Sequence, residues 1–395
     1  MSTEEQLGLF AQLETPFYYY NMGLLRETLD ALTKAADPFG YKVYYALKAN
    51  ADDRILKMVR EAGLGADCVS GNEIGKALEQ GFNPGDIVFA GVGKTDREII
   101  LGLSAGIGCF NVESEEELDV IIQLAREKKA VAPVALRLNP GVDAHTHKFI
   151  TTGMVQNKFG ILPENLSAVL HKVKDTDHIH FKGIHVHIGS QILDMAVYET
   201  LCHRLNDLLQ VVRKEGMNCG MINLGGGLGI DYENPSEYPV ADFGGLFETV
   251  HRNLHVLPGQ EVHFELGRSV VGQMGDLITR VLYVKRQGGQ QFIILDAGMT
   301  ELIRPALYGA AHKIENLSYR ERSGENLPLD HYDIVGPVCE TSDTFARDLP
   351  FPATCRGDII TIRSAGAYAR MMASKYNLRS IAGVVYSDLP GTLTT

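Results

Sequence analysis

YKVYYALKA, residues 41–49, is the first of a series of short β-branched and aromatic runs that alternate with amphipathic stretches. This alternation is typical of repeated βα units and of a parallel sheet. The candidate strands are YKVYYALKA ending at Ala49, GADCVS at Ser70, DIVFAGV at Val92, GCFNVES at Ser114, APVALRLN at Asn139, GIHVHIGS at Ser190, MINLGGG at Gly227 and VHFELGR at Arg268. Because there are eight of them, the sequence predicts an α/β fold with a (β/α)8 TIM barrel.

Helix candidates lie between these strands. NEIGKALEQGF starts at Asn72, TDREIILGLSAG at Thr95 and SEEELDVIIQLAREKK at Ser114. Each opens with a residue that can cap a helix and carries acidic residues in its first turns. The pattern therefore places helices between successive barrel strands.

The pattern changes after Arg268. Strand-like segments such as LITRVLYVKR, QFIILDAG and GDIITIRSAGAYA follow, separated by turns that contain Gly and Pro. This predicts a second, mainly β C-terminal domain, joined by the N-terminal segment TPFYYYN. The expected domains are a TIM barrel over residues 36–275 and a β-rich domain over residues 1–35 and 276–395.

Composition limits the possible functions. The 395 residues are 45% hydrophobic, enough to bury the cores of two domains, and the formal net charge of −12 argues against nucleic acid or an anionic membrane as partner. The segment MSTEEQLGLF has no basic start, and no apolar run approaches the roughly 20 residues of a membrane span. Six cysteines form no C-x-x-C pair, so we expect no metal site and a cytoplasmic location.

Polar residues gather where the expected strands end. Active sites of TIM barrels lie at this face. The residues are Lys48, Asn50, Asp67, Ser70, Asn111, Glu113, Arg137, Asn139, His185, His187, Ser190, Gly225 to Gly227, Glu265 and Arg268. One such residue could be an ordinary solvated strand end, but eight strands ending in this way indicate a site.

Two of these features suggest a particular chemistry. Lys48 ends an apolar strand, where burial would lower the pKa of its amine and suit it to a Schiff base, unless the side chain extends to the surface. The glycine turn at Gly225 to Gly227 follows the seventh strand, where TIM barrels often bind phosphate through backbone N–H groups. A tight turn without a ligand is the alternative for these glycines.

Glu265 and the two histidines fit the same chemistry. A carboxylate that faces a pyridine nitrogen keeps that nitrogen protonated and favours carbanion-forming steps, although a salt bridge to Arg268 would also explain Glu265. His185 and His187 share a strand face, and packing against an aromatic cofactor is one use of such a histidine. A hydrogen-bonded core histidine is the other, and a metal pair has no third ligand nearby.

Several motifs together resemble the diaminopimelate decarboxylases, a family of fold-type III pyridoxal-phosphate-dependent decarboxylases. The resemblance covers nearly the whole chain, and the motifs stand in the family's order and spacing. They are YALKAN at Tyr45 to Asn50, HIGSQ at His187 to Gln191, GGGLGI at Gly225 to Ile230, ELGRS at Glu265 to Ser269, GMTELIRPALY ending at Tyr308, GPVCETSD at Gly336 to Asp343 and GAY at Gly366 to Tyr368.

The resemblance implies roles for individual residues. Lys48 would bind pyridoxal 5'-phosphate covalently, His187 would stack on its ring and Glu265 would pair with the ring nitrogen. The expected cofactor-binding residues are Lys48, Asp67, His187, Ser190, Gly226, Gly227, Glu265, Gly267, Arg268 and Tyr368. The expected catalytic residues are Lys48, His187 and Cys339, and the expected substrate-binding residues are Arg268, Arg304, Tyr308, Glu340 and Tyr368.

The resemblance also implies a homodimer with shared active sites, in which Cys339 and Glu340 enter the partner's site and the β-rich domain completes the site and the interface. The reaction would be decarboxylation of meso-2,6-diaminopimelate to L-lysine and CO2, the last step of lysine biosynthesis. Leu266 departs from the family, which commonly has Pro at this position. The substitution puts the local loop geometry in doubt but removes no functional group.

The substrate can be argued from charge. Diaminopimelate carries a second amino-acid head, and a guanidinium such as that of Arg304 is the usual partner for its carboxylate. Ornithine has only an amine at that end and would favour an acidic residue. An ornithine or arginine decarboxylase is therefore the first alternative, together with an alanine-racemase-like enzyme, in which a cationic residue would be expected in place of Glu265. A decarboxylase-like binding protein without catalysis is the second.

Overall fold

The computed structural model describes residues 3–142, 158–319 and 329–394. The chain divides into two compact units. The barrel unit comprises Thr28–Gly229 and Ala241–Val270, and the β-rich unit comprises Met1–Glu27, Ile230–Val240 and Val271–Thr395. The sequence placed the domain boundaries after residues 35 and 275. These boundaries stay a prediction.

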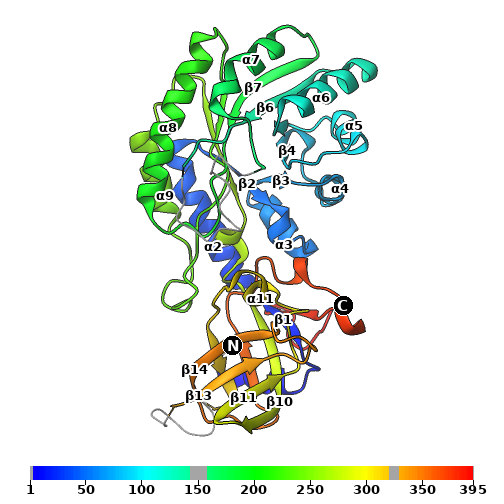
Figure 1. Ribbon diagram of the computed structural model, residues 1–395, viewed down its shortest axis with the longest axis vertical. Coiled ribbons are helices and arrows are strands. Elements are labelled where there is room, and N and C mark those ends of the chain that lie inside the picture. Colours follow the sequence, from blue (N-terminus) through cyan, green and yellow to red (C-terminus); the bar gives the residue numbers. More distant parts are fainter. Residues whose placement is uncertain (1–2, 143–157, 320–328, 395) are drawn as a thin grey trace. The chain divides into compact units, whose positions relative to one another are not determined.

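Eight parallel strands close into a barrel, as the sequence predicted (Figure 1). They are β2 (Lys42–Ala46), β3 (Gly65–Cys68), β4 (Ile87–Phe89), β5 (Cys109–Val112), β6 (Ala132–Arg137), β7 (Ile179–His185), β8 (Met221–Asn223) and β9 (Glu261–Leu266). Each overlaps one expected strand. The expected strands extend too far at their C-terminal ends, because the Gly and polar residues there form loops; Lys48 lies in a 3-10 turn at Leu47–Ala49, after β2 has ended.

Helices follow the barrel strands. They are α3 (Asp53–Glu61), α4 (Gly71–Glu79), α5 (Asp96–Ala105), α6 (Glu115–Lys128), α7 (Leu166–Lys174), α8 (Met195–Lys214) and α9 (Phe243–Asn253), with α2 (Met22–Ala36) before the first strand. Side chains cap the three helices that the sequence predicted. The Ser70, Thr95 and Ser114 hydroxyls accept hydrogen bonds from backbone N–H groups in the first turns of α4, α5 and α6.

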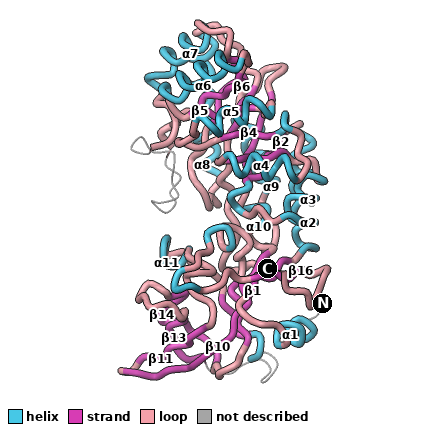
Figure 2. The backbone as a smooth tube through the Cα atoms, turned by 90° about the vertical axis from the view of Figure 1, so that its right-hand side faces the viewer, coloured by secondary structure: helices cyan, strands magenta, loops and turns pink. Residues whose placement is uncertain are grey.

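The β-rich unit contains an eight-stranded sheet (Figure 2). Its strands are β1 (Phe17–Tyr20), β10 (Gly275–Gln287), β11 (Gln290–Leu295), β12 (Ile314–Asn316), β13 (Leu329–Val335), β14 (Thr344–Pro352), β15 (Ile359–Ile362) and β16 (Gly383–Tyr386). β1, from the TPFYYYN segment, pairs with β10 and β16. Phe10 of α1 (Thr3–Ala11) packs on Phe17 and Tyr19, which connects the N-terminal helix to the sheet.

The barrel interior changes from apolar to polar along the strands. Tyr44, Val88, Cys109, Ala135 and Met221 form one buried apolar cluster. Side chains two positions apart on a strand point to the same face. The residues two positions further along β5, β6 and β8 are Asn111, Arg137 and Asn223, all buried. A polar layer therefore lies towards the C-terminal ends of the strands, on top of the apolar cluster.

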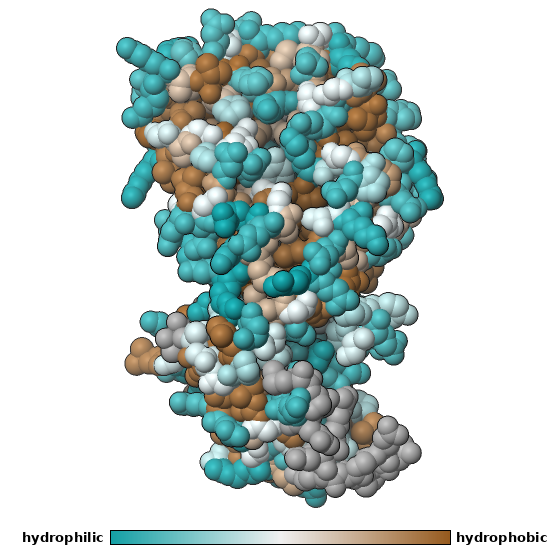
Figure 3. All heavy atoms as spheres, turned by 180° about the vertical axis from the view of Figure 1, so that it is seen from behind, coloured by the Kyte–Doolittle hydropathy of each residue, from teal (hydrophilic) through white to brown (hydrophobic). Residues whose placement is uncertain are grey.

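The surface of the chain mixes residue types. On the face drawn in Figure 3, hydrophilic and hydrophobic side chains are interspersed. None of the helices in the described part of the chain is both long and apolar enough to cross a bilayer.

Close strand contacts make Gly183 of β7 a sensitive position. A Cβ atom there would lie 1.9 Å from the carbonyl oxygen of Met221 on β8, whereas at Gly220 the nearest atom would be 3.6 Å away. Gly183→Ala should therefore lower the free energy of unfolding by about 1–3 kcal/mol. Gly220→Ala is the matched control. Urea unfolding of the two variants checks this, and equal midpoints would contradict the close approach of β7 to β8 at this position.

Candidate functional site

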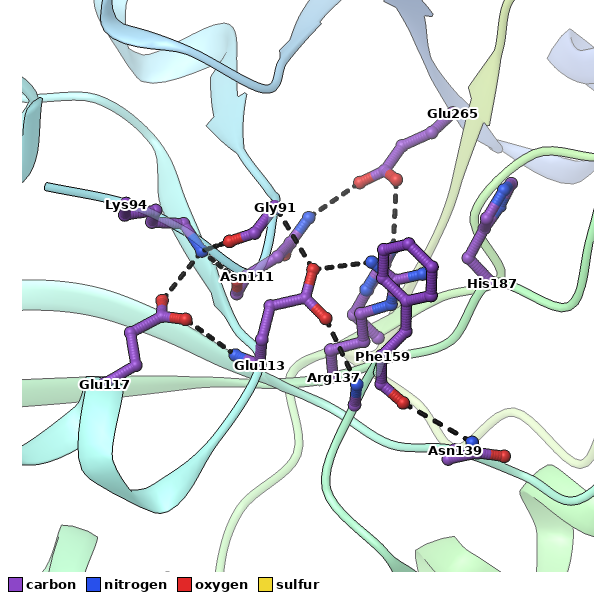
Figure 4. Close-up of polar contacts among 12 residues, drawn as sticks. Gly91, Lys94, Asn111, Glu113, Glu117, Arg137, Asn139, Phe159, His187 and Glu265 are labelled. Atoms are coloured by element: carbon purple, nitrogen blue, oxygen red, sulfur yellow. Dashed lines mark hydrogen bonds and ion pairs between the residues drawn. The ribbon is translucent and has the colours of Figure 1, made fainter. Parts of the chain in front are cut away.

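A buried carboxylate, Glu265 on β9, is the centre of the polar layer. The side-chain amides of Asn111 on β5 and Asn223 on β8 both donate hydrogen bonds to its Oε1, at 2.8 and 2.7 Å. The Nε2 atom of His185 on β7 lies 2.9 Å from its Oε2. Figure 4 shows Glu265 pointing toward Asn111. Residues from three other strands thus converge on one side chain that is 6% exposed.

The donors decide the charge of Glu265. Burial by itself raises the pKa of a carboxyl group, because the anion loses its hydration. The electrostatic attraction and the hydrogen bond of His185 act in the opposite direction, helped by Lys48, and they lower the pKa of Glu265 to about 2. Glu265 is therefore an anion at neutral pH, and it is available to a cationic or hydrogen-donating partner.

Lys48 lies at the same end of the barrel, after β2. Its Nζ is 3.8 Å from Oδ2 of Asp67, which follows on β3. The sequence suggested a buried amine, but 39% of the Lys48 side chain is exposed, because the strand has ended and the lysine stands on a turn. The amine is therefore accessible, and the carboxyl group of Asp67 is its neighbour.

Asp67 has an unusual environment. It is 1% exposed, and its Oδ1 has no hydrogen-bond partner among the described residues. Burial and the charge of Glu265 raise the pKa of Asp67 to about 8, although Lys48 opposes the shift. A buried acceptor without a donor is costly, so this atom is placed to receive a ligand proton or an N–H group.

The turn after β8 leaves no room for side chains. A Cβ atom would lie 2.4 Å from the Val186 carbonyl oxygen at Gly225 and 2.1 Å from the Glu265 carbonyl oxygen at Gly226. Gly227 has φ +124°, a conformation that favours glycine. The three residues therefore form a bare backbone turn at the end of the barrel where Glu265 lies, and a ligand can approach it closely.

A basic residue adjoins this turn. Arg268 follows β9, and its Nε and Nη2 atoms donate to the Ser190 hydroxyl at 3.2 and 3.0 Å. Gly267 is buried beside it, and its carbonyl oxygen accepts from Val270. A guanidinium, a hydroxyl and a bare backbone turn form a suitable environment for an anion.

His187 follows β7 in the loop that precedes Ser190. Its Nδ1 accepts a hydrogen bond from the Gly226 N–H, at 3.0 Å. Desolvation, followed by the positive charge of Lys48, lowers its pKa well below the usual range, so the imidazole is neutral at neutral pH. An uncharged ring, fixed at one nitrogen, can pack against a flat ligand.

A second charged group supports the ends of β5 and β6 (Figure 4). Arg137 pairs with Glu113 at 2.5 Å, with both side chains buried. The Glu113 carboxylate also accepts from the Gly91 and Gly160 N–H groups. The Arg137 guanidinium lies 4.8 Å from the centre of the Phe159 ring. These contacts join three loops beside the polar layer.

Five expected site residues belong to the β-rich unit. Arg304 opens α11 (Arg304–Tyr308), is buried, and donates to the Tyr232 hydroxyl at 2.9 Å and to Nε2 of His312 at 2.8 Å. Tyr308 ends the same helix. The others lie in loops: Cys339, Glu340 and Tyr368.

The loop that carries Cys339 and Glu340 is exposed but ordered by specific contacts. The Asp343 carboxylate accepts from the backbone N–H groups of Met299 and Val338, at 2.6 and 2.7 Å. The Tyr376 hydroxyl donates to Oε1 of Glu340, at 2.7 Å. These bonds hold the loop in a defined conformation with both residues presented at the surface of the unit.

Comparison with known proteins identifies the family. The model for "Pyridoxal-dependent decarboxylase, pyridoxal binding domain" matches residues 23–272. A diaminopimelate decarboxylase from Bacteroides thetaiotaomicron is 50% identical over 380 residues, which cover 96% of this chain and 97% of that protein. The chain belongs to the diaminopimelate decarboxylase family.

Solved structures agree with this. The structure of a diaminopimelate decarboxylase from Helicobacter pylori complexed with L-lysine has a TM-score of 0.89 and 35% identity, covering 98% of this chain and 94% of that one. An arginine decarboxylase from Paramecium bursaria Chlorella virus has a TM-score of 0.85 but 20% identity, covering 98% and 100% of the two chains. The second likeness shows the shared fold alone.

The residues present fit the cofactor of this decarboxylase family, pyridoxal phosphate. The bare turn at Gly225 to Gly227, with Ser190 and Arg268 beside it, suits the phosphate group. The exposed amine of Lys48 suits the aldehyde, and the anion of Glu265 suits the ring nitrogen. The barrel unit thus offers a partner for each polar end of the molecule.

The polar residues that the sequence placed at the strand ends lie at this end of the barrel, but sequence reasoning missed some of their contacts. Asn223 was not singled out, although it is the one polar residue of the MINL run. Asn111 was recognised only as a polar strand end, and for His185 the sequence left packing against a cofactor and a hydrogen-bonded core histidine as alternatives. Their common partner, Glu265, is 154 and 80 positions away in the sequence, and only barrel closure brings them together.

The raised pKa of Asp67 predicts how the stability of the protein depends on pH. The folded protein holds the Asp67 proton up to about pH 8, whereas the unfolded chain releases it near pH 4. Folding therefore favours the protonated form, and this residue's contribution to stability falls as pH rises between those values. Asp67→Asn cannot ionise, so its stability relative to wild type should increase from pH 5 to pH 8, by up to about 1.4 kcal/mol per pH unit.

Urea unfolding of the cofactor-free protein at pH 5, 6.5 and 8 measures this difference. Asp119→Asn, which changes an exposed carboxylate paired with Lys172, is the control and should show little pH dependence. A constant difference between wild type and Asp67→Asn would show that Asp67 is ionised throughout.

Proposed function

We propose that this protein decarboxylates meso-2,6-diaminopimelate to L-lysine and CO2, with pyridoxal phosphate as cofactor. The observation that carries the proposal is the ionised, buried Glu265 at the end of the barrel where the accessible amine of Lys48 also lies. The 50% identity to a diaminopimelate decarboxylase over nearly the whole chain supports the substrate.

Glu265 favours the carbanion-forming reactions of the cofactor, of which decarboxylation is one. When bound, pyridoxal phosphate accepts the electron pair that remains after CO2 departs, and it does so best with its ring nitrogen protonated. The negative charge of Glu265 holds that proton in place. His187, neutral and fixed by Gly226, packs on the ring face and leaves its charge unchanged.

The remaining barrel residues position the cofactor. Lys48 binds it covalently, and Asp67 keeps the lysine oriented through their contact at 3.8 Å. Ser190, the backbone of Gly226, Gly227 and Gly267, and the guanidinium of Arg268 bind its phosphate. This arrangement fixes both ends of the cofactor on the rigid barrel, and only its substrate side needs further residues.

Arg304 supplies the substrate preference in this proposal. Its guanidinium is held by Tyr232 and His312 and lies 4.9 Å from the centre of the Tyr232 ring. The His312 Nδ1 atom is 2.8 Å from the Arg363 carbonyl oxygen and donates to it, so Nε2 is the acceptor for Arg304. A fixed guanidinium favours the distal carboxylate of diaminopimelate and disfavours the bare amine of ornithine.

The other substrate-binding residues are Arg268, Tyr308, Tyr368 and Glu340. We assign Glu340 and Cys339 to the site of a partner chain, in a homodimer with shared active sites. The exposure of both residues supports this assignment, because their own unit leaves them accessible. Cys339 is then a catalytic residue that acts across the interface.

The rival functions lack support of this kind. A racemase-like enzyme would need a cation beside the ring nitrogen, where Glu265 is an anion. A silent binding protein would have no need of both Lys48 and the glycine turn. Similarity to an arginine decarboxylase is limited to the fold.

CO2 release from meso-diaminopimelate, ornithine, arginine and lysine, measured side by side, tests the proposed function. We expect diaminopimelate to be preferred by kcat/KM at least about 100-fold, because only its distal carboxylate can form a charge-assisted contact with the buried guanidinium of Arg304. Arg304→Met should reduce this preference mainly through KM. A preference for ornithine or arginine would contradict the substrate assignment.

Mixing two inactive variants tests the shared site. Lys48→Ala and Glu340→Ala chains should each be inactive alone, because each lacks one component in both sites. In a mixed dimer one site receives an intact Lys48 and an intact Glu340, so activity should return to roughly a quarter of wild type after random exchange. Exchange is verified with differently tagged chains. Confirmed exchange without recovered activity would place Glu340 in its own chain's site or outside any site.

A further inference from the structure

We propose that His185 is a positioning residue of this site: its Nε2–H fixes Oε2 of Glu265 and directs the last acceptor position of the carboxylate toward the ring nitrogen of the cofactor. The inference rests on the proposed function, in which Glu265 pairs with that nitrogen. It adds a residue that does not touch the cofactor and still controls how the cofactor is polarised.

Counting acceptor positions supports the assignment. An ionised carboxylate offers about four lone-pair positions, two on each oxygen. Asn111 and Asn223 occupy both positions on Oε1. His185 occupies one on Oε2, at 2.9 Å. The remaining position is on Oε2, so the ring nitrogen and His185 meet at the same oxygen atom.

His185 is suited to act on Glu265 alone. The residue is 1% exposed, and among the described residues its ring nitrogens make one hydrogen bond, the bond to Glu265. The Nδ1 atom is buried without a partner in the described part of the chain. Replacing the imidazole therefore removes one donor from the carboxylate and breaks no second hydrogen bond.

The other charged and titratable groups around Glu265 do not replace this donor. Lys48 acts on Glu265 through its charge, His187 is neutral at neutral pH, and Asp67 is a competing acid. Without His185, Oε2 would have no protein donor among the described residues and Glu265 would be easier to protonate. Within the described ranges, the groups that interact electrostatically with Glu265 are His185, Lys48, His187, Asp67, Tyr44, Cys109 and His263.

The test compares two cofactors on the full-length protein. Pyridoxal phosphate has a ring nitrogen, and its deaza analogue has a carbon in that place. Dissociation constants for both, measured by absorption after reconstitution of the cofactor-free protein, give a preference for the nitrogen that does not depend on turnover. We expect wild type to prefer pyridoxal phosphate about tenfold or more, the value of one charge-assisted hydrogen bond.

Three variants separate positioning from structural damage. His185→Phe removes the donor and should reduce the preference to less than about threefold. His185→Gln keeps an N–H donor and should restore most of it. His263→Phe is the matched control, because His263 is also a buried barrel histidine, bonded to Glu261 at 3.1 Å at the start of β9. It should retain the wild-type preference.

The pH dependence of the bound cofactor's absorption provides a second readout. His185 lowers the pKa of Glu265, so its removal raises that pKa, and the acid transition should move to higher pH by about one unit or more. A residue that only supports the fold would lower stability without moving this transition. If His185→Phe does not fold, His185→Leu removes the same N–H with a smaller side chain and takes its place.

The outcomes distinguish a failure of the proposed function from a failure of the positioning role of His185. If wild type binds both cofactors equally, Glu265 does not pair with the ring nitrogen, and the proposed role of Glu265 fails together with this inference. If wild type discriminates and His185→Phe discriminates equally with an unmoved acid transition, the proposed function stands and the positioning role of His185 is wrong.

Discussion

Burying one ionised carboxylate is the constraint on which this site depends. A carboxylate without partners in a protein interior costs several kcal/mol, and the group would normally take up a proton. Glu265 avoids this because three donors from three other strands reach it. The contacts require β5, β7, β8 and β9 to end at compatible heights around the barrel. The closed barrel and the charge of its central carboxylate are therefore mutually dependent.

The layered interior explains how the barrel meets this requirement. The apolar cluster below excludes water, which strengthens the hydrogen bonds above it. Because the strand period is two, Asn111 and Asn223 lie on the same strand face as Cys109 and Met221 of that cluster, each two positions later in the sequence. On each of these two strands, the apolar residue therefore packs below the polar layer, and the polar residue on the same face donates a hydrogen bond to Glu265.

The sequence predicted the barrel well because its signals are local. Strand runs, the capping residues Thr95 and Ser114, and the glycine turn all involve neighbours in the chain. The expected cap at Asn72 was wrong by two residues, because the Ser70 hydroxyl caps α4 and Asn72 lies inside that helix. The strand ends were placed too far along for a local reason as well, since the strand-like letters of the sequence continue past the last paired residue, as in the turn Leu47–Ala49 after β2. The pairing of Arg137 with Glu113 depends on the register of β5 against β6, and the three donors to Glu265 depend on closure, so no local pattern contains them. The 39% exposure of the Lys48 side chain agrees with the second of the two interpretations of the sequence, a lysine that extends to the surface, and not with a buried amine.

The chemical type of the donors has a further consequence. Asn111 and Asn223 are neutral amides, so they stabilise the negative charge of Glu265 without cancelling it. A lysine or arginine in either place would form an ion pair, and the field at the ring nitrogen would largely vanish. Neutral donors therefore satisfy two needs that usually conflict, a low free energy for the buried anion and a negative potential at its remaining acceptor position. That combination suits a carboxylate whose task is to hold a proton on the cofactor, and it explains why amides supply both bonds to Oε1.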